Sequence, residues 1–128
     1  MLILIVAGIL SFMIFFPLVV ATSVFKILDE KQSSKFLRTF FPKYYLFGFI
    51  LSALGVITSL IKQNNISILI FILLIVGFLF SRQVLMPIIN KAKDSNNEIK
   101  FIRFHKISVL INFLQIGLCI FLLVIFLK

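Results

Sequence analysis

Four long apolar runs alternate along the chain with shorter segments that carry most of its charged residues. The runs cover about residues 2–25, 44–61, 66–89 and 104–127. As α-helices rising about 1.5 Å per residue, they would be about 27–36 Å long, which matches the hydrocarbon core of a bilayer. None shows the alternation with period two that is typical of barrel strands. The pattern therefore predicts an all-α fold, a single membrane domain over residues 1–128 built as an integral membrane four-helix bundle.

Composition supports lipid as the surroundings of these helices. Hydrophobic residues make up 62% of the 128 residues, and 17 of them are Phe. A soluble domain of this length leaves a large fraction of its surface in water and could not bury so much apolar area. The first run has no basic segment before it and is too long for the apolar part of a signal peptide, so we expect it to be a retained helix.

The distribution of charge predicts the orientation. The net charge is +9. Five cations lie in residues 26–43 and six in residues 82–106, which leaves only Lys62 and Lys128 elsewhere. The expected location is the cell (inner) membrane. The positive-inside rule places these two basic segments in the cytoplasm and both chain ends on the non-cytoplasmic side. Because the cations lie between apolar runs and form no basic face or known motif, we do not expect nucleic-acid binding.

The first basic segment contains a short amphipathic pattern over residues 33–41. Its apolar positions are Phe36, Leu37, Phe40 and Phe41. They lie on one side of a helix, while the cations lie on the other side, which predicts a short interfacial helix in the headgroup layer. Ser33 or Ser34 could cap this helix, and Pro42 would end it and open the next one.

Small and polar residues mark the expected helix contacts. The second run carries Gly48, Ser52, Gly55 and Ser59 on one face. Such a face lets another helix approach closely, so we expect helix packing there. The fourth run carries a polar stripe of His105, Ser108, Asn112, Gln115 and Cys119. These groups would lack partners in lipid, so the stripe is expected to face the bundle. Asn112 and Gln115 have two interpretations, interhelical hydrogen bonds alone or part of a binding site.

The irregular and polar features gather in the cytoplasmic half. Pro17 and Pro87 each remove a helix hydrogen bond and predict kinks. Arg82 either extends to the headgroups or binds an anionic group, such as a lipid phosphate, together with His105. The candidate polar site consists of Arg82, Asn90, His105, Ser108 and Asn112.

Side chains for catalysis and metal binding are sparse. All four acids lie outside the predicted spans, and the chain has one His and one Cys. A zinc site needs three or four ligands, and the lone His105 has no obvious nearby acid that would complete a nucleophile–base–orienter set. We therefore expect no enzyme activity, no metal site and no cofactor. The lone Cys119 also excludes an intrachain disulfide.

Several short motifs together resemble a known family. They are Phe16-Pro17, Phe41-Pro42-Lys43-Tyr44-Tyr45, Arg82 with Pro87 and Asn90, and Phe104-His105-Lys106 with Ser108 and Asn112. Their order resembles a bacterial family of four-helix membrane proteins classed as a domain of unknown function. That family is similar to a eukaryotic transmembrane protein associated with cisplatin resistance. The residues that the resemblance marks are Pro17, Pro42, Tyr45, Arg82, Pro87, Asn90, His105, Ser108 and Asn112.

These features favour a non-enzymatic multi-pass membrane protein, either an accessory or assembly subunit of a larger complex or a lipid-interacting scaffold. The alternative is a small-solute or metal-drug transporter or exporter that acts as an oligomer, because four helices enclose little volume. The expected partners are the lipid bilayer, anionic lipid headgroups, and either further copies of the chain or another membrane protein.

Overall fold

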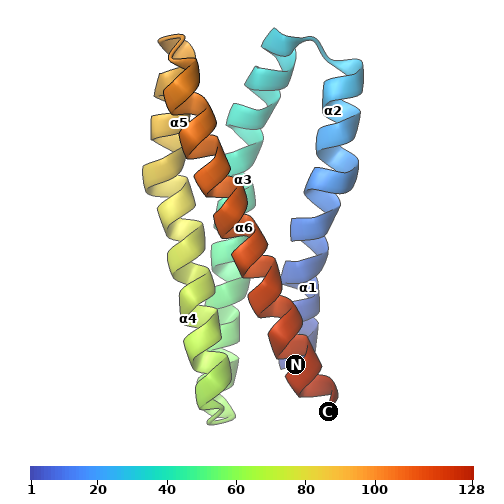
Figure 1. The fold of residues 1–128 in the computed structure, drawn as a ribbon. Coiled ribbons are helices and arrows are strands. Elements are labelled where there is room, and N and C mark those ends of the chain that lie inside the picture. The colour runs from blue at the N-terminus through green and yellow to red at the C-terminus, as the bar shows by residue number, and fades with distance from the viewer.

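The computed structural model describes residues 1–128, and the chain consists of helices joined by short turns (Figure 1). The elements in order are α1 (Leu2–Phe15), the π-helical turn η1 (Phe16–Val20), α2 (Ala21–Ile27), α3 (Glu30–Ile61), α4 (Asn65–Phe80), the π-helical turn η2 (Ser81–Leu85), α5 (Met86–Asp94) and α6 (Glu98–Leu127). The prediction of an all-α fold is confirmed.

The elements join into four continuous helices, each long and apolar enough to cross a membrane. They are Leu2–Ile27, Glu30–Ile61, Asn65–Asp94 and Glu98–Leu127. Only 24 of the 128 residues are buried, and many large apolar side chains are exposed on the outside of the bundle. An apolar exterior of this extent suits lipid rather than water. The chain is therefore a multi-pass membrane four-helix bundle.

Each of the two π-helical turns lies beside a proline. In η1, which contains Pro17, the N–H of Ala21 donates to the carbonyl of Phe16, five residues earlier. At the end of η2 the N–H of Met86 donates in the same way to Ser81, just before Pro87. A proline has no N–H to give to the carbonyl four residues earlier, and a wider turn accommodates that gap. The helices continue through both sites.

The beginning of α3 differs from the sequence prediction. Residues 33–41 form no separate interfacial helix, because α3 runs unbroken from Glu30 to Ile61 with Pro42 inside it. Its N-cap is Asp29, whose Oδ1 accepts from the N–H of Gln32 at 2.7 Å, rather than Ser33 or Ser34. Aromatic contacts explain the difference. Phe40 stacks on Phe16 at 4.7 Å between ring centroids, so this segment packs onto the first span instead of lying apart.

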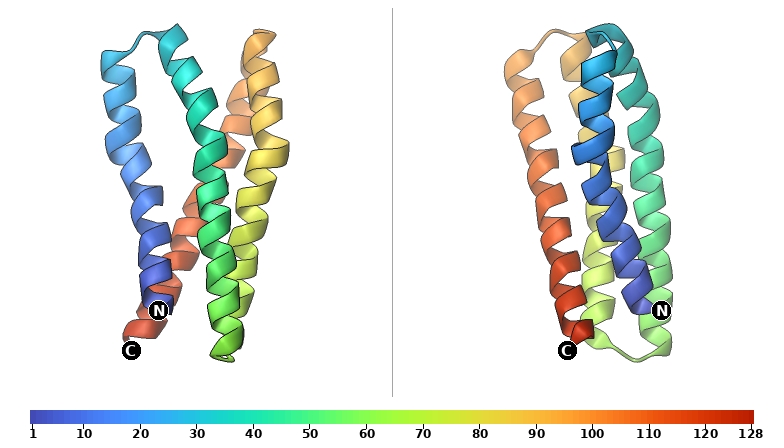
Figure 2. Two further views of the ribbon diagram at one scale, coloured as in Figure 1. Left: turned by 180° about the vertical axis from the view of Figure 1, so that it is seen from behind. Right: turned by 90° about the vertical axis from the view of Figure 1, so that its right-hand side faces the viewer.

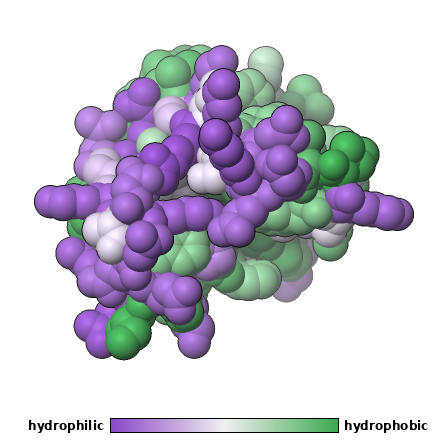
Figure 3. All heavy atoms as spheres, turned by 90° about the horizontal axis from the view of Figure 1, so that it is seen from above, coloured by the Kyte–Doolittle hydropathy of each residue, from purple (hydrophilic) through white to green (hydrophobic).

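The two ends of the bundle differ in charge. The turns at 28–29 and 95–97 lie at one end, here called the basic end, and both termini lie with the turn at 62–64 at the other, the terminal end (Figure 1). Seen along the axis, the basic end presents a mostly hydrophilic surface (Figure 3). All four acids and 11 of the 13 Lys and Arg residues belong to the segments near this end.

The turns at 62–64 and 95–97 share one local design. A residue with positive φ, Gln63 or Asn96, ends the preceding helix. The next residue is an asparagine, Asn64 or Asn97, whose side chain caps the following helix. Asn64 also donates its N–H to Ser59, and Asn97 donates to Ala92, which completes a Schellman motif in each case. These short turns fix α3 against α4 and α5 against α6 as antiparallel neighbours.

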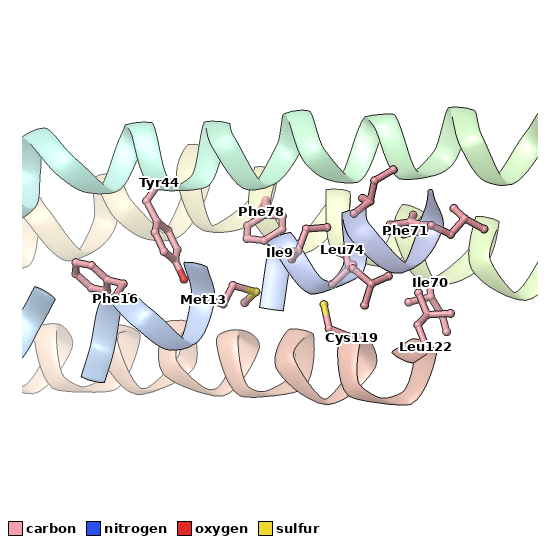
Figure 4. Packing of buried hydrophobic residues seen from close by; sticks show 13 residues of the cluster. Ile9, Met13, Phe16, Tyr44, Ile70, Phe71, Leu74, Phe78, Cys119 and Leu122 are labelled. Carbon is pink, nitrogen blue, oxygen red and sulfur yellow. The ribbon is translucent and has the colours of Figure 1, made fainter. Parts of the chain in front are cut away.

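The terminal half is closely packed around α3 and α4. Gly48, Ser52, Gly55 and Ser59 are all buried on one face of α3. A Cβ on Gly48 would lie 2.6 Å from the Phe78 ring, and one on Gly55 would overlap the ring of Phe71. Two aromatic rings of α4 therefore occupy the space that these glycines leave. The surrounding core includes Ile9, Met13, Leu74, Cys119 and Leu122 (Figure 4).

Helix α6 changes neighbours along its length. It packs against α1 near the termini and against α5 near the basic end (Figures 1 and 2). Between these contacts it crosses the bundle obliquely, and its N-terminal half diverges from α2 (Figure 2). This divergence positions the site described next.

Candidate functional site

A cavity of about 790 Å³ lies in the half of the bundle near the basic end. All four long helices contribute to its lining of 26 residues, of which 15 are hydrophobic. A volume of this size is within the range of small-molecule and cofactor sites. The lining on η2 and α5 runs from Ser81 to Lys93, which corresponds to a length of about 18 Å along the helix axis.

The wall formed by the first span is apolar throughout. It consists of Phe16, Pro17, Ala21, Phe25 and Leu28. The π-helical turn η1 lies in this wall. The side chains that a ligand would meet on this wall are aromatic and aliphatic only.

The opposite wall, on α5 and α6, carries polar groups among apolar ones. Its polar residues are Asn90, Lys93, His105, Ser108 and Asn112. The hydroxyl of Ser108 donates to the carbonyl of His105 at 2.8 Å, so it is satisfied within its own helix. The His105 ring stacks on Phe101, with 5.7 Å between centroids. The cavity is thus amphiphilic, apolar on one side and partly polar on the other.

The end of the cavity toward the termini is closed. Tyr44 and Asn112 meet there, and the tyrosine hydroxyl donates to Asn112 Oδ1 at 3.4 Å. Beyond this pair, toward the termini, Met13 of α1, Phe78 of α4 and Cys119 of α6 are fully buried. Figure 4 shows these three side chains among the core residues that lie beyond Phe16 and Tyr44. The cavity therefore ends within the bundle and does not continue to the terminal end.

The cavity reaches the apolar outer surface between α2 and α6. Phe25 on α2 lines it and is 61% exposed. On α6, Phe113 and Val109 also line it and are 67% and 39% exposed. Side chains that both line a cavity and reach the surface mark its edge. Because the divergence of α2 and α6 separates these edges, a molecule in the bilayer would have lateral access here.

A polar recess adjoins the cavity at the basic end, and we call it the vestibule. It is lined by Glu30, Lys31, Ser34, Lys35, Arg38, Thr39, Lys93 and Asp94, none of them hydrophobic. Arg38 pairs with Asp94 across it, with Nη1 donating to Oδ2 at 3.0 Å and Nη2 donating to Oδ1. Nη2 also donates to the carbonyl of Asn90 at 3.3 Å. These contacts join the start of α3 to the end of α5.

The structure brings four of the five residues of the predicted polar site to the cavity. Asn90, His105, Ser108 and Asn112 all line it. Arg82 does not. Its Nε donates to the carbonyl of Pro42 at 3.1 Å and its Nη1 to the side chain of Gln83 at 2.9 Å, with no bond to His105. The suggested pair of Arg82 and His105 around one anion is therefore absent, and Arg82 instead joins η2 to α3.

Other marked residues have structural positions. Gln115, in the same polar stripe, donates to the carbonyl of Leu74 at 3.1 Å and serves as an interhelical contact. Pro17 lines the cavity, as does Tyr45, whereas Pro42 and Pro87 do not. No group of three or more His, Cys, Asp or Glu side chains is placed to hold a metal ion.

Sequence reasoning did not single out Arg38, Asp94 or Lys93 for the site. Arg38 and Asp94 are 56 residues apart and lie in different basic segments. One signal was available. If the apolar side of residues 33–41 packs on the first span, the side with Arg38 is free to contact another segment. The other basic segment, residues 82–106, offers an acid at Asp94.

Comparison with known proteins gives one match. The family model described as a domain of unknown function (DUF4149) matches residues 4–98, well over half of the chain. The match includes the first three spans but not α6, which carries His105, Ser108 and Asn112. No curated protein and no solved structure matches the chain. The chain thus belongs to the DUF4149 family, whose function its description leaves open.

Proposed function

We propose that this chain is a non-enzymatic, lipid-interacting scaffold of the cell (inner) membrane that holds one lipid molecule among its spans. The observation that carries the proposal is the amphiphilic cavity of about 790 Å³ with apolar lateral access between α2 and α6. A membrane lipid would place its chains against Phe16, Ala21 and Phe25. Its more polar portion would meet the wall formed by α5 and α6.

The orientation follows from the basic end. With 11 of 13 cations in the two segments near it, the positive-inside rule favours a cytoplasmic basic end and both termini outside. The cavity would then lie in the half of the membrane formed by the cytoplasmic leaflet. The first turns of α3, with Phe36 and Phe40, would lie at headgroup level as part of the second span.

Transport by an oligomer is the second candidate, and the polar wall from His105 to Asn112 favours it. For a solute to cross, the layer of Met13, Phe78 and Cys119 would have to separate, because all three are fully buried. Binding needs no such movement, and for that reason we prefer it. Flux into proteoliposomes that Ser108→Phe abolishes would support transport through this cavity.

Lipid retention tests the binding proposal with a matched pair of variants. Ser108 lines the cavity, and its hydroxyl bonds to its own helix. Ser11 is exposed on α1, does not line the cavity, and bonds to the carbonyl of Ala7 in the same way. Ser108→Phe should place a bulky ring inside the cavity and obstruct it, whereas Ser11→Phe adds the same ring to the outer surface.

The measurement is native mass spectrometry after purification in lipid-free detergent. We expect one lipid to remain with the wild type and with Ser11→Phe, and to be lost from Ser108→Phe. Equal retention by all three proteins, or none by the wild type, would contradict the proposal. Melting temperatures of both variants establish that each is folded.

Orientation and assembly are measured separately. Single cysteines replacing Lys62 and Ser95 in a Cys119→Ala background should react from opposite sides, with Ser95→Cys labelled from the cytoplasm. Labelling of both from one side would contradict the proposed orientation. The role as a subunit further predicts a defined homo-oligomer or a membrane partner in mild detergent, and a monomer alone would count against that role.

A further inference from the structure

We propose that the lipid held in the cavity is an anionic phospholipid, with its chains in the cavity and its phosphate in the vestibule beside Lys93. This inference rests on the proposed function and specifies its ligand. It rests on three properties of the structure: a lining shared by the two spaces, an excess of positive charge in the vestibule, and a length that suits a lipid in one leaflet.

The cavity and the vestibule adjoin and share part of their lining. Glu30, Ser34, Arg38 and Lys93 line both of them. The cavity is mainly hydrophobic in its lining, whereas no hydrophobic residue lines the vestibule. A single molecule spanning both would therefore need an apolar part and a strongly polar head, in the order found in a membrane lipid.

The vestibule has an excess of cations. Lys31, Lys35, Arg38 and Lys93 line it with only two acids, Glu30 and Asp94. The ion pair of Arg38 and Asp94 is the one salt bridge in the structure, so these two charges compensate each other. Three lysines then remain against Glu30. An anionic head would reduce this excess of positive charge, whereas a zwitterionic head would bring no net charge to it.

Lys93 is the best placed of these lysines. It is partly buried and lies where the cavity meets the vestibule. Its Nζ lies 5.6 Å from the centroid of the Phe101 ring and forms no ion pair. An ammonium group in this position is available to a phosphate oxygen, and its attraction is stronger near the membrane than in bulk water because the local dielectric constant is lower.

The length of the site also fits. From Lys93 to Ser81 the lining extends about 18 Å along the axis, and one leaflet contributes about 15 Å of hydrocarbon. A phosphate at Lys93 would therefore allow an acyl chain to extend along the cavity as far as its closed end near Tyr44. The acyl chain could also reach the bilayer between Phe25 and Phe113.

The test compares phosphatidylglycerol with phosphatidylcholine of the same chains, added to delipidated protein in neutral detergent. Native mass spectrometry measures the bound fraction of each. We expect the wild type to prefer phosphatidylglycerol. In Lys93→Gln the ratio of bound phosphatidylglycerol to bound phosphatidylcholine should fall about fivefold, in line with the attraction of one cation near an anionic membrane. Lys93→Arg should keep the preference, and higher salt should weaken it.

A matched control removes the same charge outside the site. Lys91 lies two residues from Lys93, is exposed, and lines neither space. Lys91→Gln should leave the preference unchanged. Glycerol 3-phosphate at equal ionic strength should not displace the lipid, because a head without chains gains nothing from the cavity.

The outcomes separate this inference from the proposed function. Equal binding of the two lipids, together with loss of both in Ser108→Phe, would overturn the anionic site and leave lipid binding intact. Equal effects of Lys91→Gln and Lys93→Gln would assign the preference to general surface charge and also overturn it. Displacement of the lipid by glycerol 3-phosphate would show that the site binds a phosphate without needing lipid chains, and would overturn the inference.

Discussion

The two halves of this bundle consist of similar helices, but one half is closely packed and the other encloses a cavity. In the terminal half, the rings of Phe71 and Phe78 lie directly on Gly55 and Gly48, and little space remains. In the half near the basic end, α6 diverges from α2 and a cavity of about 790 Å³ separates the helices. Close packing follows from complementary small and large residues on paired helices, and where that pairing stops the bundle opens.

The comparison also explains where the polar groups lie. The buried Gln115 in the packed half is held by the carbonyl of Leu74. Three residues earlier along α6, Asn112 lies at the inner end of the cavity with one long contact to Tyr44. The same polar stripe thus serves packing in one half and lines a binding space in the other.

The largest expected effect comes from overfilling the packed half. Gly55→Leu would force a side chain into the Phe71 ring and should destabilise the bundle by about 1–3 kcal/mol or more. Gly117→Leu is the control, because a Cβ there would meet nothing within 4 Å. Thermal unfolding in detergent measures both. Similar melting temperatures for the two variants would contradict the packing described here.

An intermediate effect is expected along the polar stripe. Gln115→Met keeps the length of the side chain but removes its bond to Leu74, and interhelical hydrogen bonds of this kind contribute about 0.6–1.7 kcal/mol. Asn112→Leu removes a longer contact beside an open space and should destabilise less. Chemical unfolding in mixed micelles gives the order. A greater loss in Asn112→Leu would show that the inner end of the cavity, not the packed half, holds α6.

The sequence predicted the four helices well because each is encoded locally. Long apolar runs and the face of Gly48, Ser52, Gly55 and Ser59 depend only on spacing within one segment. The polar site was predicted in part for the same reason. His105, Ser108 and Asn112 recur on one face of α6, and a stripe of polar groups can be assigned to the interior without knowing its neighbours.

The failures concern contacts between segments. Whether residues 33–41 lie on the membrane or continue into α3 depends on Phe16 of the first span, which receives the ring of Phe40. Arg82 was expected at the site because it stands alone among apolar residues, yet the carbonyl that it reaches belongs to Pro42. Neither partner can be identified from spacing within one helix.

The smallest expected effect concerns the contact between α3 and α5 at the basic end. Arg38→Asp and Asp94→Arg each place like charges together in an exposed site, so each should lower the melting temperature by at most about 4 °C. The double variant Arg38→Asp/Asp94→Arg restores an ion pair and should recover most of that loss. Glu98→Arg makes the same change of net charge as Asp94→Arg, at the same end but outside the vestibule, and is the control for that variant.

Amide hydrogen exchange shows where the contact acts. Loss of the ion pair should speed exchange in the first turns of α3 and the last turn of α5 while leaving Gly48 to Ser59 unchanged, because the packed half is held by its own aromatic contacts. Faster exchange in both halves would mean that the ion pair stabilises the whole bundle. Since the cavity lies between these two regions, a change confined to the basic end would also show that the end of the cavity beside the vestibule can loosen while its closed end stays packed.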